Sequence, residues 1–175
     1  MEGSHEVSNH GEGELVMDER HYLDVLIKSL QQKREVLIKI IEKNVQQTTL
    51  LSQENVDMDT WERLVDEKGV LIDQLNFLDA GFEEVYERVH VILKEQKDLF
   101  REEVACMQKL ISELTDLSVT IQSGEMRNRD LAERQFSKYR SKAKSLTQNN
   151  RAAKMYRSNM RGTGVLDPQF MDKKH

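Results

Sequence analysis

Residue types that carry chemistry are few in this chain, and they lie far apart in the sequence. The single cysteine, Cys106, has no second thiol for a disulfide or a zinc site, and its apolar neighbours predict a half-buried, inert thiol. His21 and His90 are isolated in different helical patterns. Glycine-rich nucleotide loops, nucleophile elbows and zinc motifs are missing, and the many carboxylates lie at helical spacing on charged faces. We therefore expect no enzyme activity, no metal site and no cofactor.

The basic segment of residues 127–161 is the second candidate for a function. It contains 11 Lys and Arg residues against 2 acids, whereas residues 1–126 contain 13 against 27. Phe136, Tyr139 and Tyr156 lie among the basic residues. Such a segment is suited to nucleic acid, through phosphate contacts and stacking, or to an anionic membrane surface. Docking on the acidic rest of the chain and docking on a partner helix are two further possibilities.

Sparse apolar residues indicate that the same segment binds a partner. Small and polar residues replace the usual leucines there, and so thin an apolar face folds mainly on the surface of a partner. We rank partner binding first, docking within the chain second and nucleic acid third. The residues that we expect to contact the partner are Leu131, Phe136, Tyr139, Leu146, Asn150, Ala153, Tyr156 and Met160.

The elements that carry these residues follow from composition and periodicity. A single proline, a third of charged residues and abundant Leu, Glu, Lys and Gln are typical of long helices. Apolar residues recur at helical spacing over about 18–53, 59–94 and 98–160. The predicted fold class is all-α, an elongated antiparallel bundle of three long helices with coiled-coil-like packing. We expect residues 1–17 to be a disordered N-terminal tail and residues 162–175 to be a flexible C-terminal tail.

Nothing in the sequence indicates secretion or membrane insertion. No apolar run approaches the roughly 18 residues of a membrane span. The polar N-terminus lacks the apolar segment of a secretory signal. Since a lone cysteine also fits a reducing compartment, we expect a cytoplasmic protein.

The second helix begins with a capping pattern and carries a polar residue in its apolar stripe. Asp59 is the predicted N-cap, because Glu62 follows it at the spacing of a capping box. Trp61, the only tryptophan, is expected in the core. Lys68 holds a stripe position, so its stem should lie along the apolar seam with its amine reaching out. Gly69 lies off the stripe, and no packing reason explains it.

The end of the second helix is less clearly marked. Its apolar phase runs on without a break, so one helix over 60–122 is an alternative. Such a helix would be almost twice as long as the first and would overhang it. We therefore predict a turn near 94–98, with a bend at 79–81 as the other possibility, and an irregularity at Ser123 and Gly124.

A resemblance to a known family begins within this second helix. The stretch WERLVDEKGVLIDQLNFLDAGFEEVYERV resembles the central part of bacterial flagellar export chaperones of the FlgN type. Their pattern of an acid, Glu and Lys followed by Leu-Ile-x-x-Leu is present here as DEK and LIDQL. Three downstream stretches are similar to variants in clostridial-type flagellar operons, namely LISELTDLSVTIQ, NNRAAKMYRSNM and the terminal FMDKK. The resemblance extends over roughly residues 18–175.

The resemblance implies both a fold and a role. It implies an all-helical antiparallel bundle in the cytoplasm, without a cofactor, that binds hook-associated proteins of the hook–filament junction by their terminal amphipathic helices. The resemblance further implies that binding precedes type III secretion and that the export apparatus then removes the client. In such chaperones the C-terminal helical part typically holds the client.

The sequence is compatible with further functions as well. The FliT type of chaperone serves the filament cap protein with a similar architecture, so the client is undecided. The long basic last helix and the polar N-terminal tail depart from the shorter enteric proteins, and they leave a monomer or a dimer open. A structural coiled-coil protein also fits the helical periodicity, and a binder of nucleic acid or an anionic surface fits the basic residues of 127–161.

Overall fold

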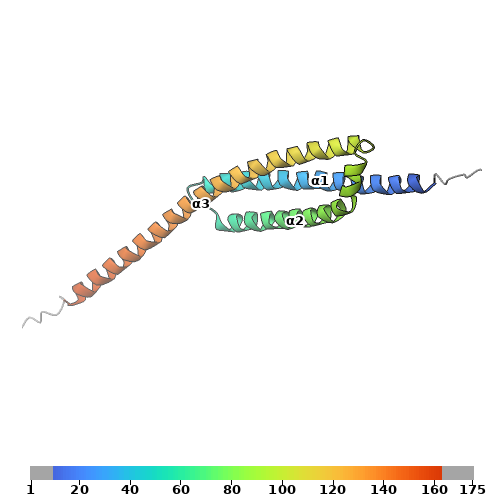
Figure 1. The fold of residues 1–175 in the computed structure, drawn as a ribbon. Coiled ribbons are helices and arrows are strands. Elements are labelled where there is room, and N and C mark those ends of the chain that lie inside the picture. The colour runs from blue at the N-terminus through green and yellow to red at the C-terminus, as the bar shows by residue number, and fades with distance from the viewer. Residues whose placement is uncertain (1–9, 163–175) are drawn as a thin grey trace, which may run out of the picture. The chain divides into compact units, whose positions relative to one another are not determined.

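The computed structural model describes residues 10–162, and the side chains of residues 18–161. Within this range the chain forms three helices, α1 (His10–Leu51), α2 (Met58–Glu95) and α3 (Arg101–Gly162) (Figure 1). The predicted all-α bundle of three helices is therefore confirmed. The chain divides into two compact units, of which the first extends to Leu131 and the second begins at Ala132. Each unit is described by itself below.

The helix boundaries differ from the expected ones mainly at the N-terminus. α1 begins at His10, so the predicted tail of residues 1–17 is too long. Extension of an existing helix adds one hydrogen bond per residue and needs no new nucleus, which favours the longer helix. Residues 1–9 and the predicted C-terminal tail beyond 162 lie outside the described residues.

α2 starts and ends at residues that the sequence does not mark strongly. The N-cap is Asp57 and not Asp59, since the Asp57 carboxylate accepts from the Asp59 N–H at 3.2 Å and from Thr60 Oγ1 at 2.7 Å. α2 runs through Gly81 without a break and ends at Glu95. The Gln96 N–H then donates to the Ile92 carbonyl at 2.8 Å, and the chain reverses without glycine or proline.

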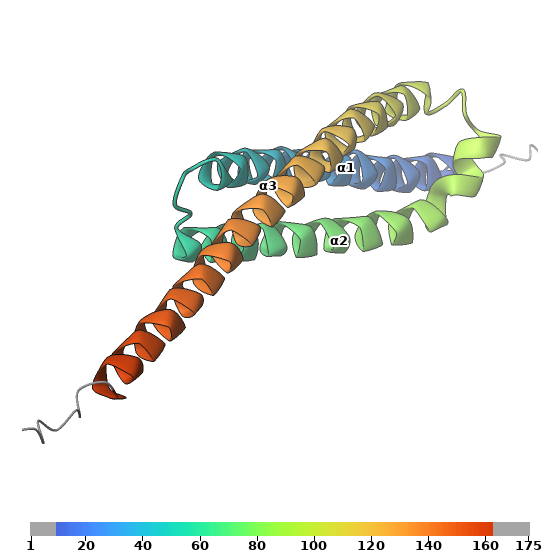
Figure 2. The same ribbon diagram turned by 90° about the vertical axis from the view of Figure 1, so that its left-hand side faces the viewer.

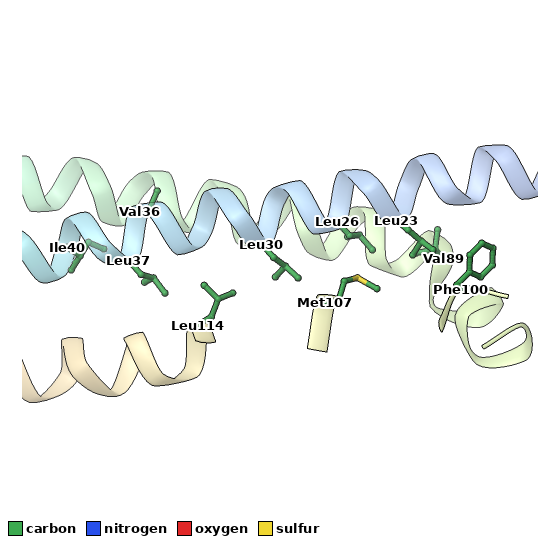
Figure 3. Close-up of a cluster of buried hydrophobic side chains, with 10 residues drawn as sticks. All are labelled: Leu23, Leu26, Leu30, Val36, Leu37, Ile40, Val89, Phe100, Met107 and Leu114. Atoms are coloured by element: carbon green, nitrogen blue, oxygen red, sulfur yellow. The ribbon is translucent and has the colours of Figure 1, made fainter. Parts of the chain in front are cut away.

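The core of the first unit is built on α1 (Figure 3). Figures 1 and 2 show α1 and α2 side by side, with a short connection joining them. α2 buries only Leu64 and Val89 fully, and most of its apolar stripe, Trp61 included, stays half-buried. The ten residues of the buried cluster are Leu23, Leu26, Leu30, Val36, Leu37, Ile40, Val89, Phe100, Met107 and Leu114.

Ion pairs connect α1 to both of its neighbours in the first unit. Lys33 pairs with Asp79 of α2 at 2.5 Å, and the adjacent Arg34 pairs with Glu113 of α3 at 2.9 Å. Consecutive residues of α1 thus contact different helices, which is possible because they point in directions about 100° apart. Such exposed pairs add little stability, so apolar burial on α1 holds the unit together.

Candidate functional site

A partly buried layer of polar side chains joins the three helices of the first unit. The amine of Lys68 in α2 donates to Glu125 Oε1 at 2.8 Å, to Gln47 Oε1 at 2.7 Å and to Asn44 Oδ1 at 3.1 Å. All three of its N–H groups are therefore used. The expectation that this amine reaches solvent is wrong, because only 12% of the side chain is exposed. These hydrogen bonds link α2 to α1 through Asn44 and Gln47 and to α3 through Glu125.

Asn128 of α3 completes the layer. Its Nδ2 donates to the Asn44 carbonyl at 2.9 Å, and its Oδ1 accepts from Thr48 Oγ1 at 2.6 Å. Asn128 is almost fully buried. Moving α3 along α1 by one turn would leave these buried groups without partners, at about 1–3 kcal/mol each. We call Asn44, Gln47, Thr48, Lys68, Glu125 and Asn128 the polar layer, and it fixes the register of α3 against α1 and α2.

Gly124 lets α3 approach α1 at this layer. A Cβ at Gly124 would lie 3.1 Å from Asn44 Nδ2, which is tighter than most real Cβ contacts, and 3.4 Å from Asn44 Cβ. The predicted irregularity at Ser123 and Gly124 is wrong, because α3 is continuous there. The glycine serves close packing between helices, whereas Gly69 has nothing within 4 Å of such a Cβ.

The last part of α3, residues 140–161, is the candidate binding surface. Every residue in it is exposed. It contains seven Lys and Arg residues and no Asp or Glu. Tyr139, Leu146, Ala153 and Met160 follow one another at intervals of seven, so they form one row along the helix, which we call the α3 row. Leu146 is 56% exposed and Met160 is 59% exposed.

The eight predicted contact residues fall into two groups. Leu131, which belongs to the first unit, and Phe136 and Tyr139 of the second unit are half-buried. The other five are exposed on residues 140–161, and these are Leu146, Asn150, Ala153, Tyr156 and Met160. Met155, 69% exposed, was not predicted, because it lies off the stripe.

A second apolar surface lies on the first unit, and the sequence did not predict it. A hollow of about 450 Å³ between α1 and α2 is lined by Val25, Leu26, Phe77, Gly81 and Phe82, among others. Of these lining residues, Phe77 is 78% exposed. A smaller hollow of about 350 Å³ lies where all three helices meet. The sequence contains one indication of this surface, because Phe77 is an apolar residue that lies off the helical stripe.

Other chemistry finds little support in the described part of the chain. Within residues 18–161 no three His, Cys, Asp or Glu side chains gather as metal ligands would. Across the described helices no segment has the length and apolar character of a membrane span. Cys106 is exposed and not half-buried, because it lies on the outer side of α3 next to the buried Met107.

Two carboxylates have a shifted pKa, and both shifts belong to the scaffold. A hydrogen bond from Lys43 lowers the pKa of Glu67, and one from Thr60 lowers that of Asp57. Both carboxylates lie at the surface, and both are far from the α3 row in sequence. They stabilise helix ends and pairings and give no sign of a catalytic site.

Comparison of the chain with models of known protein families, with curated proteins and with solved structures finds no match.

Proposed function

We propose that this protein is a cytoplasmic chaperone of flagellar type III secretion that binds hook-associated proteins before their export. The resemblance of residues 61–89 to chaperones of the FlgN type supports the family assignment. One observation of the structure carries the binding role. Residues 140–161 form continuous helix in which every residue is exposed, and they carry three of the four members of the α3 row, Leu146, Ala153 and Met160.

The α3 row is suited to an amphipathic helix of a client. Such a helix packs its own apolar face along the row, with contacts repeating every three or four residues. Free terminal helices of hook-associated proteins would associate with each other, and a chaperone that covers them prevents this. In this role the protein needs no catalytic residue and no cofactor.

A thin row gives moderate affinity, which the role requires. Leu146 and Met160 are the large aliphatic members, and Ala153 between them adds little area. Full burial of one such side chain contributes about 1.5–3 kcal/mol before the cost of association is subtracted. A client held by so few anchors is released easily when the export apparatus takes it.

The experiment is recovery of the client from flagellated cells of the source organism. The tagged full-length protein should retain hook-associated proteins, and purified client should bind it in solution. The double variant Leu146→Asp with Met160→Asp should lose the client while circular dichroism stays helical. Val45→Asp is the matched control, since Val45 is 60% exposed on α1, away from the row in sequence. If the wild-type protein retains no hook-associated protein, the proposal is wrong; retention of the filament cap protein would assign the client of the FliT type.

Binding to an anionic surface is the second candidate function. It is favoured by the seven basic residues and the lack of any acid within residues 140–161. It predicts association with duplex DNA or anionic vesicles that weakens steeply with salt. Absence of such binding at low salt removes this candidate and leaves a client-binding or a structural coiled-coil protein.

A further inference from the structure

We propose that residues 140–161 select a partner helix whose apolar face is flanked by acidic side chains. The inference rests on the proposed function and names the chemistry of its client helix. It is carried by the positions of charged and polar residues relative to the α3 row.

Basic and amide side chains lie between successive members of the row. Lys142 lies three residues after Tyr139 and four before Leu146, so it shares their face. Arg157 lies four residues after Ala153 and three before Met160, so it shares theirs. Asn149 and Asn150 lie between Leu146 and Ala153 in the same way, three or four residues from each. Lys142, Asn149, Asn150 and Arg157 are all exposed, so a partner on the row meets these groups directly.

A second copy of this chain does not fit the face. In a parallel pair, Lys142 would lie opposite Lys142 of the other copy. In an antiparallel pair centred on Asn149 and Asn150, Lys142 would lie opposite Arg157. Both arrangements oppose like charges, and residues 140–161 hold no acid that could compensate.

An acidic amphipathic helix satisfies the face in full. Glu or Asp beside its apolar residues would pair with Lys142 at one end and Arg157 at the other, and an amide would meet Asn149. Opposite charges along such a seam set partner choice and orientation, and a polar residue within it sets the register. A membrane would gain little from this face, because Ala153 of the row and the neighbouring Asn149 and Asn150 occupy its centre.

The test measures binding of labelled synthetic helices to the full-length protein by fluorescence anisotropy. The first peptide has Leu at the seam positions and Glu at the flanking positions. The second replaces each Glu by Lys, and the third keeps Glu but replaces each Leu by Ser. We expect the first peptide to bind at least about tenfold more tightly than either of the others, because only it matches both apolar row and charge.

Charge reversal in the protein gives the decisive control. The variant Lys142→Glu with Arg157→Glu should prefer the Lys peptide, with circular dichroism unchanged because both residues are exposed. Wild-type protein mixed with this variant should also associate in sedimentation, more strongly than either alone. Equal binding of the Glu and Lys peptides, or no change of preference in the variant, overturns the proposal. Equal binding of the Ser peptide, or full displacement by duplex DNA or phosphatidylserine vesicles, overturns it in favour of a purely electrostatic surface.

The two proposals fail in different ways. Hook-associated proteins that bind without any preference for acidic flanks would leave the chaperone function standing and remove the charge rule. Selective binding of the Glu peptide without any hook-associated client would keep the charge rule and remove the flagellar assignment.

Discussion

Replacing Lys68 by methionine should destabilise the first unit strongly, although it removes a charged side chain from an apolar stripe. Methionine retains most of the apolar stem, so the change removes the amine and little else. The amine donates to Asn44 and Gln47, which are 4% and 1% exposed. Its third acceptor, Glu125, has a side chain that is 45% exposed and can be hydrated instead.

The magnitude follows from these three partners. Each buried oxygen that loses its donor costs about 1–3 kcal/mol. Gln47 Oε1 would keep only a long contact of 3.5 Å from Asn128 Nδ2. The half-exposed ion pair with Glu125 adds at most about 1 kcal/mol. We therefore expect a loss of about 3 kcal/mol in the free energy of unfolding, which lowers Tm by roughly 6–12 °C for a chain of this length.

The assay is urea unfolding followed by the fluorescence of Trp61, which lies in α2 and is the only tryptophan. Lys33→Met is the matched control. It also removes a lysine that bridges α1 and α2, but its partner Asp79 is half-exposed and keeps access to water. We expect this control to lower the free energy of unfolding by less than about 1 kcal/mol. The reasoning is refuted if Lys68→Met costs no more than Lys33→Met.

Two further predictions concern glycines and a helix cap. Gly124→Ala should lower Tm, because the added Cβ would press on Asn44. Gly69→Ala should instead raise the free energy of unfolding by about 1 kcal/mol, through helix propensity alone. Thermal unfolding compares the two variants, and equal shifts in Tm would contradict the close packing at Gly124. Asp57→Ala should lower Tm at neutral pH, because the cap is lost. The pKa of Asp57 lies below its ordinary value of 3.8, first because of the hydrogen bond from Thr60, so its contribution is present above that value and is lost as pH falls through the lower folded-state pKa. The Tm difference between wild type and Asp57→Ala should therefore shrink below about pH 4, and a constant difference would exclude this cause.

The helices were predictable because their signal is local. Apolar residues at helical spacing predicted three helices, and the length argument placed a turn after α2. The N-cap was displaced by two residues because both Asp57 and Asp59 fit the pattern, and only geometry decides which carboxylate faces the first N–H groups.

The polar layer was not predictable, because its partners are far apart in the sequence. Lys68 and Glu125 are 57 residues apart, and Asn128 and Asn44 are 84 apart. In the sequence each of these residues is only a defect in an apolar stripe. Periodicity predicts which residues face inward, but it does not tell which helix supplies the acceptor for a buried donor.

One face of α3 carries polar residues both where the helix is covered by α1 and where it is exposed. Asn128, Lys142 and Asn149 lie fourteen and seven residues apart, so they fall on one face of the helix. In the first unit, α1 supplies the carbonyl of Asn44 and the hydroxyl of Thr48 to Asn128. Lys142 and Asn149 are exposed. A helix that covers the α3 row must do for these two residues what α1 does for Asn128, and an acceptor that suits Lys142 best is a carboxylate. The polar residues of the face would therefore define the chemistry of the proposed partner as much as its apolar residues would.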